Sequence, residues 1–354
     1  MRPLQLIQIG ALLALTLTAC NSKTTYSFPT ETISMRARTP AQEDFQPFYN
    51  SYNAFVKQNA DEHAIENDNF LFPVLSSYQT GLTILASAES KSYQEAARFL
   101  RTDAPDEYPL VQCFNPILID LKKRQNLKFG SSLWMIWPIP LEKPFSFEMA
   151  EKLSSDIIRL GNTGVTAHNA MDRWLQKFEP EIKIKNPGLE RNESIMSVGV
   201  TTLTLNLSLS KTETPDGQKV WIATDDQFAF VAWKADNNLN ILSPKQFHLL
   251  LQNIISPHPG KESRFVTNHE TNLTKSLEAL DCNQILTGPN NFRNLSVEII
   301  PEGDRIGIPY LRQHAALTLN FQGENPFEGS EPISYAVLDK KSEMPILIGK
   351  HTPK

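Results

Sequence analysis

Two strand-like segments near the carboxyl end of the chain are separated by a very short connection. Residues 314–321 and 333–338 alternate between apolar and other side chains, which is the pattern of half-buried strands. Eight of the eleven residues between them are mostly polar or turn-forming: Glu324, Asn325, Pro326, Phe327, Glu328, Gly329, Ser330 and Glu331. Fully extended, eight residues reach at most about 29 Å. The connection can therefore join two strands, but it leaves no length for a further strand between them.

The first twenty residues predict export and attachment to lipid. Residues 4–19 are apolar apart from two Gln and two Thr. This stretch is shorter than the roughly 20 residues that cross a bilayer, so residues 1–19 are predicted to be a signal peptide. The stretch ends in Leu17-Thr18-Ala19-Cys20, which resembles a bacterial lipobox whose cysteine is acylated. The alternative is an ordinary signal peptide in which Cys20 is incidental.

Acylation of Cys20 would determine where the protein resides. Two or three acyl chains on one cysteine exceed the single chain that binds membranes only marginally, so the anchor would be stable. Asn21 at the next position resembles a signal for sorting to the outer membrane. We therefore predict a lipid-anchored protein of the bacterial cell envelope, at the outer membrane.

The remaining residues divide into a tether and one domain. Residues 20–44 are polar and rich in Ser, Thr and Pro, which predicts a flexible tether. From residue 45 the composition becomes globular and no later stretch resembles a linker, so residues 45–354 are predicted to form a single domain. The net charge of −5 gives no general attraction to nucleic acid.

The order of the predicted elements indicates an α+β fold. Helical spacing comes first, at residues 48–60, 76–86, from Ser92, 108–123, 146–160 and 168–178. Strand patterns dominate later, at residues 129–137, 195–207, 219–224, 227–234, 295–300, 314–321, 333–338 and 345–349. Helices and strands that do not alternate regularly, with several hairpins, are typical of the α+β class.

The chain carries none of the common catalytic or metal-binding motifs. Gly-x-Ser-x-Gly, His-Glu-x-x-His, a Walker-type loop and Cys-x-x-Cys are all missing from the sequence. We expect neither an enzyme nor a bound metal or cofactor. Cys113 and Cys282 could form a disulfide in an exported protein, or they could remain buried free thiols.

Six segments resemble the serpin family in their order and spacing. They are residues 69–76 (NFLFPVLS), 87–92 (SAESKS), 127–136 (LKFGSSLWMI), 171–175 (MDRWL), 272–292 (NLTKSLEALDCNQILTGPNNF) and 332–350, from Pro332-Ile333 to Gly349-Lys350. The resemblance implies N-terminal helices packed on a large mixed β-sheet, with smaller sheets beside it.

The resemblance also implies a mechanism that this chain departs from. An inhibitory serpin presents a long reactive loop, which after cleavage inserts into the large sheet as a new strand. In the family that loop lies between the strand beginning at the motif matched by His314-Ala315-Ala316 and the strand beginning at Pro332-Ile333. Residues 324–331 are too short for insertion, and they carry Glu, Phe and Pro where the hinge would need small residues.

The point where the large sheet of a serpin parts also differs in this sequence. Phe72 and Leu75, on either side of Pro73, stand where the family has two Ser. The loss of these polar groups predicts a sheet held shut by packing. His314 matches a histidine of the family, but the Asn expected near Gly199 is missing, and a core histidine is the simpler interpretation of His314.

Two further features concern the smaller sheet and the surface. Residues 194–207 are followed almost directly by a hairpin pattern, whereas the family has two strands of a smaller sheet between these segments. Lys122, Lys123, Arg124 and Lys128 form a basic cluster at the end of the region that resembles helix D, where some serpins bind polyanions. A solvated helix end is the commoner explanation of such a cluster, since cations there favour the helix dipole.

Together these features predict an envelope-anchored, serpin-like lipoprotein with a trimmed top region and reactive loop. We expect it to act as a binding module for an unidentified protein partner, without inhibition by loop insertion. The alternative is an inhibitor of serine or cysteine proteases that uses a different, reversible contact.

Overall fold

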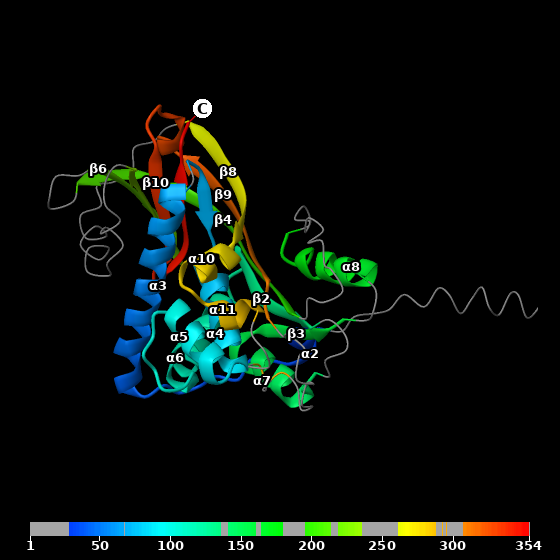
Figure 1. Cartoon of the computed structure of the whole chain (residues 1–354). Helices are drawn as coiled ribbons and strands as arrows, with labels where there is room; N and C mark the ends of the chain where they lie inside the picture. The colour runs from blue at the N-terminus through cyan, green and yellow to red at the C-terminus, as the bar shows by residue number, and fades with distance from the viewer. Residues whose placement is uncertain are drawn as a thin grey trace, which may run out of the picture.

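The computed structural model describes residues 28–66, 68–135, 141–160, 164–179, 195–213, 219–235, 261–287, 292, 295 and 307–353 (Figure 1). Cys20, the predicted signal peptide, residues 20–27 of the tether and almost all of the predicted strand 295–300 lie outside these residues. Within the described ranges, no helix combines the length and the hydropathy needed to cross a bilayer.

Among the described residues, one sheet is antiparallel throughout and has six strands in the order β1-β11-β10-β7-β6-β5. Its strands are β1 (Phe70–Phe72), β5 (Ser210–Glu213), β6 (Lys219–Thr224), β7 (Phe228–Lys234), β10 (Ile333–Asp339) and β11 (Pro345–His351). The carboxyl-terminal strands occupy its middle, which explains their nearly continuous burial.

The other sheet is mixed and, in the part of the chain that the structure describes, has five strands in the order β3-β2-β4-β9-β8. Its strands are β2 (Leu127–Met135), β3 (Ser155–Arg159), β4 (Ile195–Ser208), β8 (Glu262–Asn272) and β9 (Tyr310–Gln322). The central strands β4 and β9 run parallel, whereas β2 and β8 are antiparallel to their inner neighbours. This is the large mixed sheet that the sequence predicts.

The helices surround the sheets and join them into one body. They are α2 (Pro29–Thr32), η1 (Gln42–Asp44), α3 (Phe45–Glu66), α4 (Val74–Ser87), α5 (Ser90–Phe99), α6 (Tyr108–Leu121), α7 (Lys143–Leu153), α8 (Gly164–Leu175), α10 (Leu273–Ala279), α11 (Asn283–Thr287) and η4 (Pro326–Glu328). Figure 1 shows α3 to α6 on one side of the five-stranded sheet and α8 on the other.

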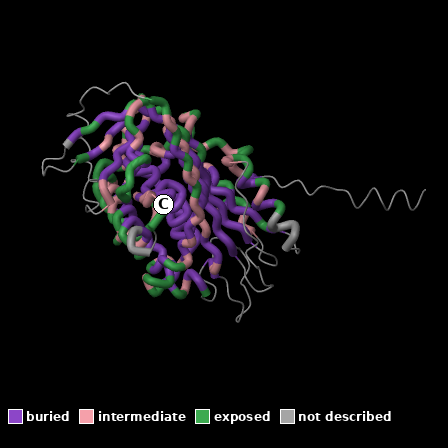
Figure 2. Tube along the Cα trace, turned by 90° about the horizontal axis from the view of Figure 1, so that it is seen from above, coloured by how far each residue is buried: buried purple, intermediate pink, exposed green. Residues whose placement is uncertain are grey.

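All residues of helix α4 are buried, and Figure 2 shows that buried residues fill the interior of the molecule. Its Thr and Ser hydroxyls are compatible with burial because several donate back to the helix. Thr83 Oγ1 donates to the Gln79 carbonyl at 2.9 Å, and Ser87 Oγ donates to the Thr83 carbonyl at 2.6 Å. Aromatic side chains of α3, including Phe48 and Phe55, pack against Tyr78 of α4.

Three sequence-based expectations need correction. The tether does not extend through residues 28–44, because Phe28 is buried and this segment packs on the domain, which therefore begins before residue 45. The helix expected over 146–160 ends at Leu153, because Ser154 adopts a left-handed conformation (φ 54°) that turns the chain into β3. Strand β8 was not predicted, because it is an edge strand in which few residues are buried and the apolar alternation is weak.

Candidate functional site

The short connection between β9 and β10 folds as a compact turn. Residues 326–328 form the 3-10 helix η4, and Asn325 begins it by accepting a hydrogen bond from the Phe327 amide at 3.0 Å. The amide of Gly323 donates to the Lys261 carbonyl at the start of β8. We call residues 324–331 the link.

The side chain of Phe327 fixes the link to the body of the protein. It is 7% exposed and stacks on Phe265 of β8, with the ring centroids 3.8 Å apart and the planes 15° from parallel. Four more rings lie at centroid distances between 5.2 and 6.2 Å, those of Phe230, Phe321, Tyr335 and His351. These residues come from both sheets, so the link closes the space between the two sheets.

The charged residues of the link remain at the surface. Glu324 pairs with Lys211 of β5, and Glu331 pairs with Lys234 of β7 at 2.6 Å. Glu328 accepts a weak hydrogen bond of 3.4 Å from the Asn325 side chain. Burial of these carboxylates in a sheet would be unfavourable, and all three are exposed here.

The sheet has no gap beside β9 into which another strand could enter without disruption. A segment that reverses direction after β9 would run antiparallel to both β4 and β9, so it would enter between these two parallel strands. They are paired without interruption from Met196–Tyr310 to Ser208–Gln322. The five-stranded sheet is therefore closed along the whole length of β9.

A layer of buried polar side chains lies between this strand pair and α4. Gln313 of β9 donates through Nε2 to Thr80 Oγ1 at 3.1 Å, and its Oε1 accepts from Ser76 Oγ at 3.1 Å. Thr201 of β4 donates to Ser76 Oγ at 3.0 Å. We call Ser76, Thr80, Thr201 and Gln313 the polar layer. The loss of polar groups expected at this point is therefore not found, because Ser76 and Gln313 supply them.

Gly199 makes room for the polar layer. It pairs with Gln313 across β4 and β9, and a Cβ atom at Gly199 would lie 2.0 Å from Gln313 Oε1. The side chain expected from β4 at this point is thus replaced by one from β9. Gln313 was not predicted from the sequence, because no local pattern distinguishes it from its neighbour His314.

The four positions proposed from the sequence for the parting point lie apart from that layer. Phe72 is the last residue of β1, Pro73 precedes α4, and Leu75 is buried in the first turn of α4. Because side chains alternate along a strand, His314 points to the face opposite Gln313. His314 is 5% exposed, and burial lowers the pKa of its imidazole, with Glu270 opposing this effect and Arg312 adding to it.

The comparisons with known proteins rest on structure. No protein-family model matches the sequence, and no curated protein matches it significantly. Among solved structures, the thermophilic serpin tengpin in its native state superposes with a TM-score of 0.69, covering 93% of this chain and 99% of that one at 14% identity. The fold is that of a serpin.

Two further serpins confirm this result across distant animals. Serpin-12 from Manduca sexta gives a TM-score of 0.66 at 16% identity and covers 86% of this chain and 97% of its own. The mouse protein-Z dependent protease inhibitor gives 0.69 at 10% identity, covering 88% and 100%. At such identities the likeness shows the serpin fold alone, as the six sequence segments predicted.

The mid-chain deletion is visible in the described part of this serpin fold. Strand β4 ends at Ser208 and β5 begins at Ser210, so the chain passes directly from the five-stranded to the six-stranded sheet. The two strands that the family has between these segments do not occur there. The link and this direct passage are adjacent, since Glu324 pairs with Lys211 of β5.

The basic cluster is only partly available for a ligand. Lys122, Lys123 and Lys128 are exposed. Arg124 instead forms ion pairs with Asp120 at 2.8 Å and with the buried Asp339 at 3.2 Å. Arg124 therefore holds the end of α6 against β10, and polyanion binding by the three lysines stays a prediction.

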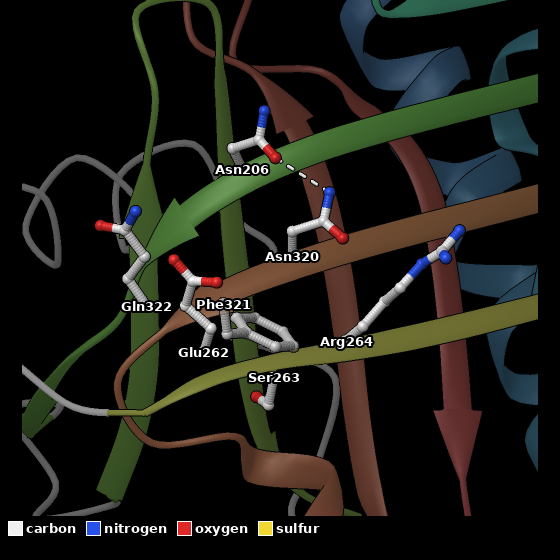
Figure 3. Close-up of a pocket in the computed structure, with 7 residues that line it drawn as sticks. All are labelled: Asn206, Glu262, Ser263, Arg264, Asn320, Phe321 and Gln322. Atoms are coloured by element: carbon white, nitrogen blue, oxygen red, sulfur yellow. Dashed lines mark hydrogen bonds between the residues drawn. The ribbon is translucent and has the colours of Figure 1, made fainter.

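A shallow polar hollow lies at the link end of the five-stranded sheet (Figure 3). It has a volume of about 410 Å³, and Asn320 donates to Asn206 across it at 2.9 Å. Its lining comes from β4, β8 and β9: Asn206, Glu262, Ser263, Arg264, Asn320, Phe321 and Gln322. Amide and charged groups on an open sheet surface suit a polar partner better than an apolar one.

Cys113 and Cys282 are free, buried thiols, and burial raises the pKa of each to about 11. Of the two alternatives that the sequence left open, the structure thus favours unpaired thiols. Among the described residues, no three His, Cys, Asp or Glu side chains gather as metal ligands would.

Proposed function

We propose that this protein is a lipid-anchored, serpin-fold binding module of the bacterial cell envelope that does not inhibit proteases by loop insertion. One observation carries the proposal: the reactive loop is replaced by an eight-residue link whose Phe327 is buried between the two sheets. Eight residues could extend to about 29 Å at most, and together with Gly323 and Pro332 they are already engaged in joining β9 to β10. The link therefore offers neither an exposed segment for a protease to bind nor a strand that could insert.

The direct test is incubation with a panel of serine and cysteine proteases, followed by denaturing gel electrophoresis. We expect no covalent complex that survives SDS, because no insertable segment exists to trap an acylated protease. Such a complex would refute the proposal.

A second measurement probes the sheet itself. A protease site introduced at Gly329 and Ser330, both exposed in the link, should allow cleavage between the sheets. We expect cleavage to lower the melting temperature or leave it unchanged, because the released ends cannot enter between β4 and β9. A large increase in melting temperature would mean that the sheet has gained a strand and would contradict the proposal.

The lipid anchor has its own test. Cys20 follows the lipobox-like residues Leu17-Thr18-Ala19, so the Cys20→Ala variant should be released from membranes when cells are fractionated. Continued membrane association of this variant would count against lipidation at Cys20.

A second candidate function is reversible protease inhibition. Similarity to solved serpins supports it, since one of them is named as a protein-Z dependent protease inhibitor. Reversible inhibition without a covalent complex in the protease panel would favour this candidate. Neither candidate function is enzymatic.

A further inference from the structure

The first described residues attach the N-terminal segment to the domain. We call residues 28–38 the clasp. Phe28 is 5% exposed and packs edge-to-face against Trp134 of β2, with the ring centroids 6.2 Å apart. The ammonium group of Lys177 lies 3.6 Å from the centre of the Phe28 ring, and Lys177 also pairs with Glu31. The start of the clasp is thus held by the sheet and by the segment that follows α8.

Asp156 of β3 depends on the clasp for its hydrogen bonds. Its side chain is buried and accepts from the Thr30 amide at 2.8 Å and from Thr30 Oγ1 at 2.7 Å. A third hydrogen bond comes from Trp174 Nε1 at 2.8 Å. Release of the clasp would remove two of these three donors from a buried carboxylate, which is strongly unfavourable.

Hydrogen bonds also attach the C-terminal end of the clasp to the domain. The Arg38 amide donates to Oδ1 of the buried Asn115 of α6 at 2.9 Å. The Arg38 guanidinium donates to Glu151 of α7 at 2.9 Å. Residues 28–38 therefore belong to the folded domain from their first residue to their last.

The clasp and the link lie at opposite ends of the five-stranded sheet. Trp134, which contacts Phe28, stands in a row with Met196 and Tyr310, and Tyr310 is the first residue of β9. The link follows the last residue of β9, Gln322. Thirteen residues of strand span about 40 Å at roughly 3.3 Å per residue. Figure 1 shows α2, β3 and α7 at one end of the molecule and the junction of β9 and β10 at the other.

We propose that the clasp sets the orientation of the domain on the membrane, with the end formed by α2, β3 and α7 facing the lipid surface. The inference rests on the proposed lipidation of Cys20. Cys20 precedes Phe28 by eight residues, so covalent geometry limits their separation to about 29 Å. A tether running freely to residue 45 would allow any orientation, whereas the clasp attaches the anchor to one end of the domain.

An exposed aromatic side chain at the same end supports this orientation. Phe147 of α7 is 48% exposed, and Lys143 lies one helical turn before it at the start of α7. An aromatic ring next to a lysine suits the boundary between lipid and water. The link and the polar hollow are then presented away from the membrane, where a partner can reach them.

The test is resonance energy transfer between a labelled protein and acceptor lipids in phosphatidylethanolamine and phosphatidylglycerol vesicles. Full-length lipidated protein carries one added cysteine, either Phe147→Cys on α7 or Ser330→Cys in the link, both at exposed positions. The native thiols Cys113 and Cys282 are buried with a pKa raised to about 11, so they should not react. We expect strong transfer from position 147 and weak transfer from position 330.

Loosening the clasp should remove the difference between the two positions. The Phe28→Ala and Thr30→Ala substitutions together delete the buried ring and one hydrogen bond to Asp156. Thr32→Ala is the matched control, because the Thr32 hydroxyl is exposed and, among the described residues, donates only to the nearby Pro29 carbonyl. The contrast should persist in the control and disappear in the double variant.

Equal transfer from the two positions in the otherwise native protein would overturn the inference, and so would a contrast that survives loosening of the clasp. If the double variant fails to fold, the comparison of positions 147 and 330 in the native background still decides. Flotation with the vesicles separates the two proposals. Protein that does not float refutes the lipid anchor and the orientation together, whereas protein that floats without contrast refutes the orientation alone.

Discussion

The link and the polar layer depart from the expected serpin pattern in opposite directions. The link has lost the length and the small residues of a reactive loop, and Phe327 buries itself between the sheets. The polar layer beneath β4 and β9 keeps uncharged hydrogen-bonding groups, although they come from residues other than those expected. Inhibition by loop insertion needs both a segment that can insert and a sheet that can open. Here the proposed loss of the first goes together with uncharged polar groups that are retained beneath the second.

The largest expected effect concerns the aromatic ring that fixes the link. Phe327→Ala should lower the free energy of unfolding by about 3–5 kcal/mol, because it removes a buried ring and leaves a cavity between the sheets. Urea denaturation measures the change. Phe147→Ala is the matched control, since Phe147 is 48% exposed, and it should change stability by less than about 0.5 kcal/mol. A similarly small effect at Phe327 would mean that the link is loosely held, and the comparison would fail.

Substitution of one glycine in the polar layer and one in the link tests the comparison further. Gly199→Ala would place a Cβ atom 2.0 Å from Gln313 Oε1, so it should destabilise the protein by about 1–3 kcal/mol. Gly329→Ala in the link is the control, because its Cβ would meet nothing nearer than the Pro326 carbonyl oxygen at 3.8 Å.

A double-variant cycle identifies the cause of that effect. Adding Gln313→Ala to Gly199→Ala removes the side chain that the new Cβ would meet. The two changes should therefore cost less together than the sum of their separate effects in urea denaturation. Strict additivity would show that Gly199 does not act by making room for Gln313.

The smallest expected effect is a pH dependence of the stability, which should arise at the link and not at the polar layer. His351 contacts Phe327 and Phe265, and burial lowers the pKa of its imidazole. As the pH falls below about 6.5, the unfolded chain takes up a proton at this residue more readily than the folded protein does. Stability should therefore decrease with falling pH, and this contribution is absent at neutral pH, where both states are uncharged.

The measurement compares the native protein with His351→Gln by denaturation at about pH 7.5 and pH 5.5. The substitution should reduce the loss of stability between these values. Other buried histidines, such as His63, whose pKa burial lowers to about 4, contribute equally to both proteins and cancel in the difference. Gln313→Ala, in a layer of uncharged groups, should leave the pH dependence unchanged. An unchanged slope in His351→Gln would show that the link end is not sensitive to pH.

The sequence alone determined the class and order of the elements. Strand patterns at 195–207, 219–224 and 333–338 match β4, β6 and β10 closely, because one face or both faces of each strand are buried and the apolar residues reveal it. The six serpin-like segments predicted the fold, which the solved serpins confirm. The length of the link is likewise a property of the sequence, since no arrangement in space can lengthen eight residues.

Tertiary structure decided which side chains meet. Nothing local indicates that Gln313 rather than its neighbour His314 faces α4, because that choice depends on the register between β4 and β9. The burial of Phe327 depends equally on Phe265, which lies on a strand too polar to be predicted. Residues 28–38 looked like a tether because their few apolar groups show no periodicity. Partners far away in the sequence, among them the buried carboxylate of Asp156, make them part of the domain.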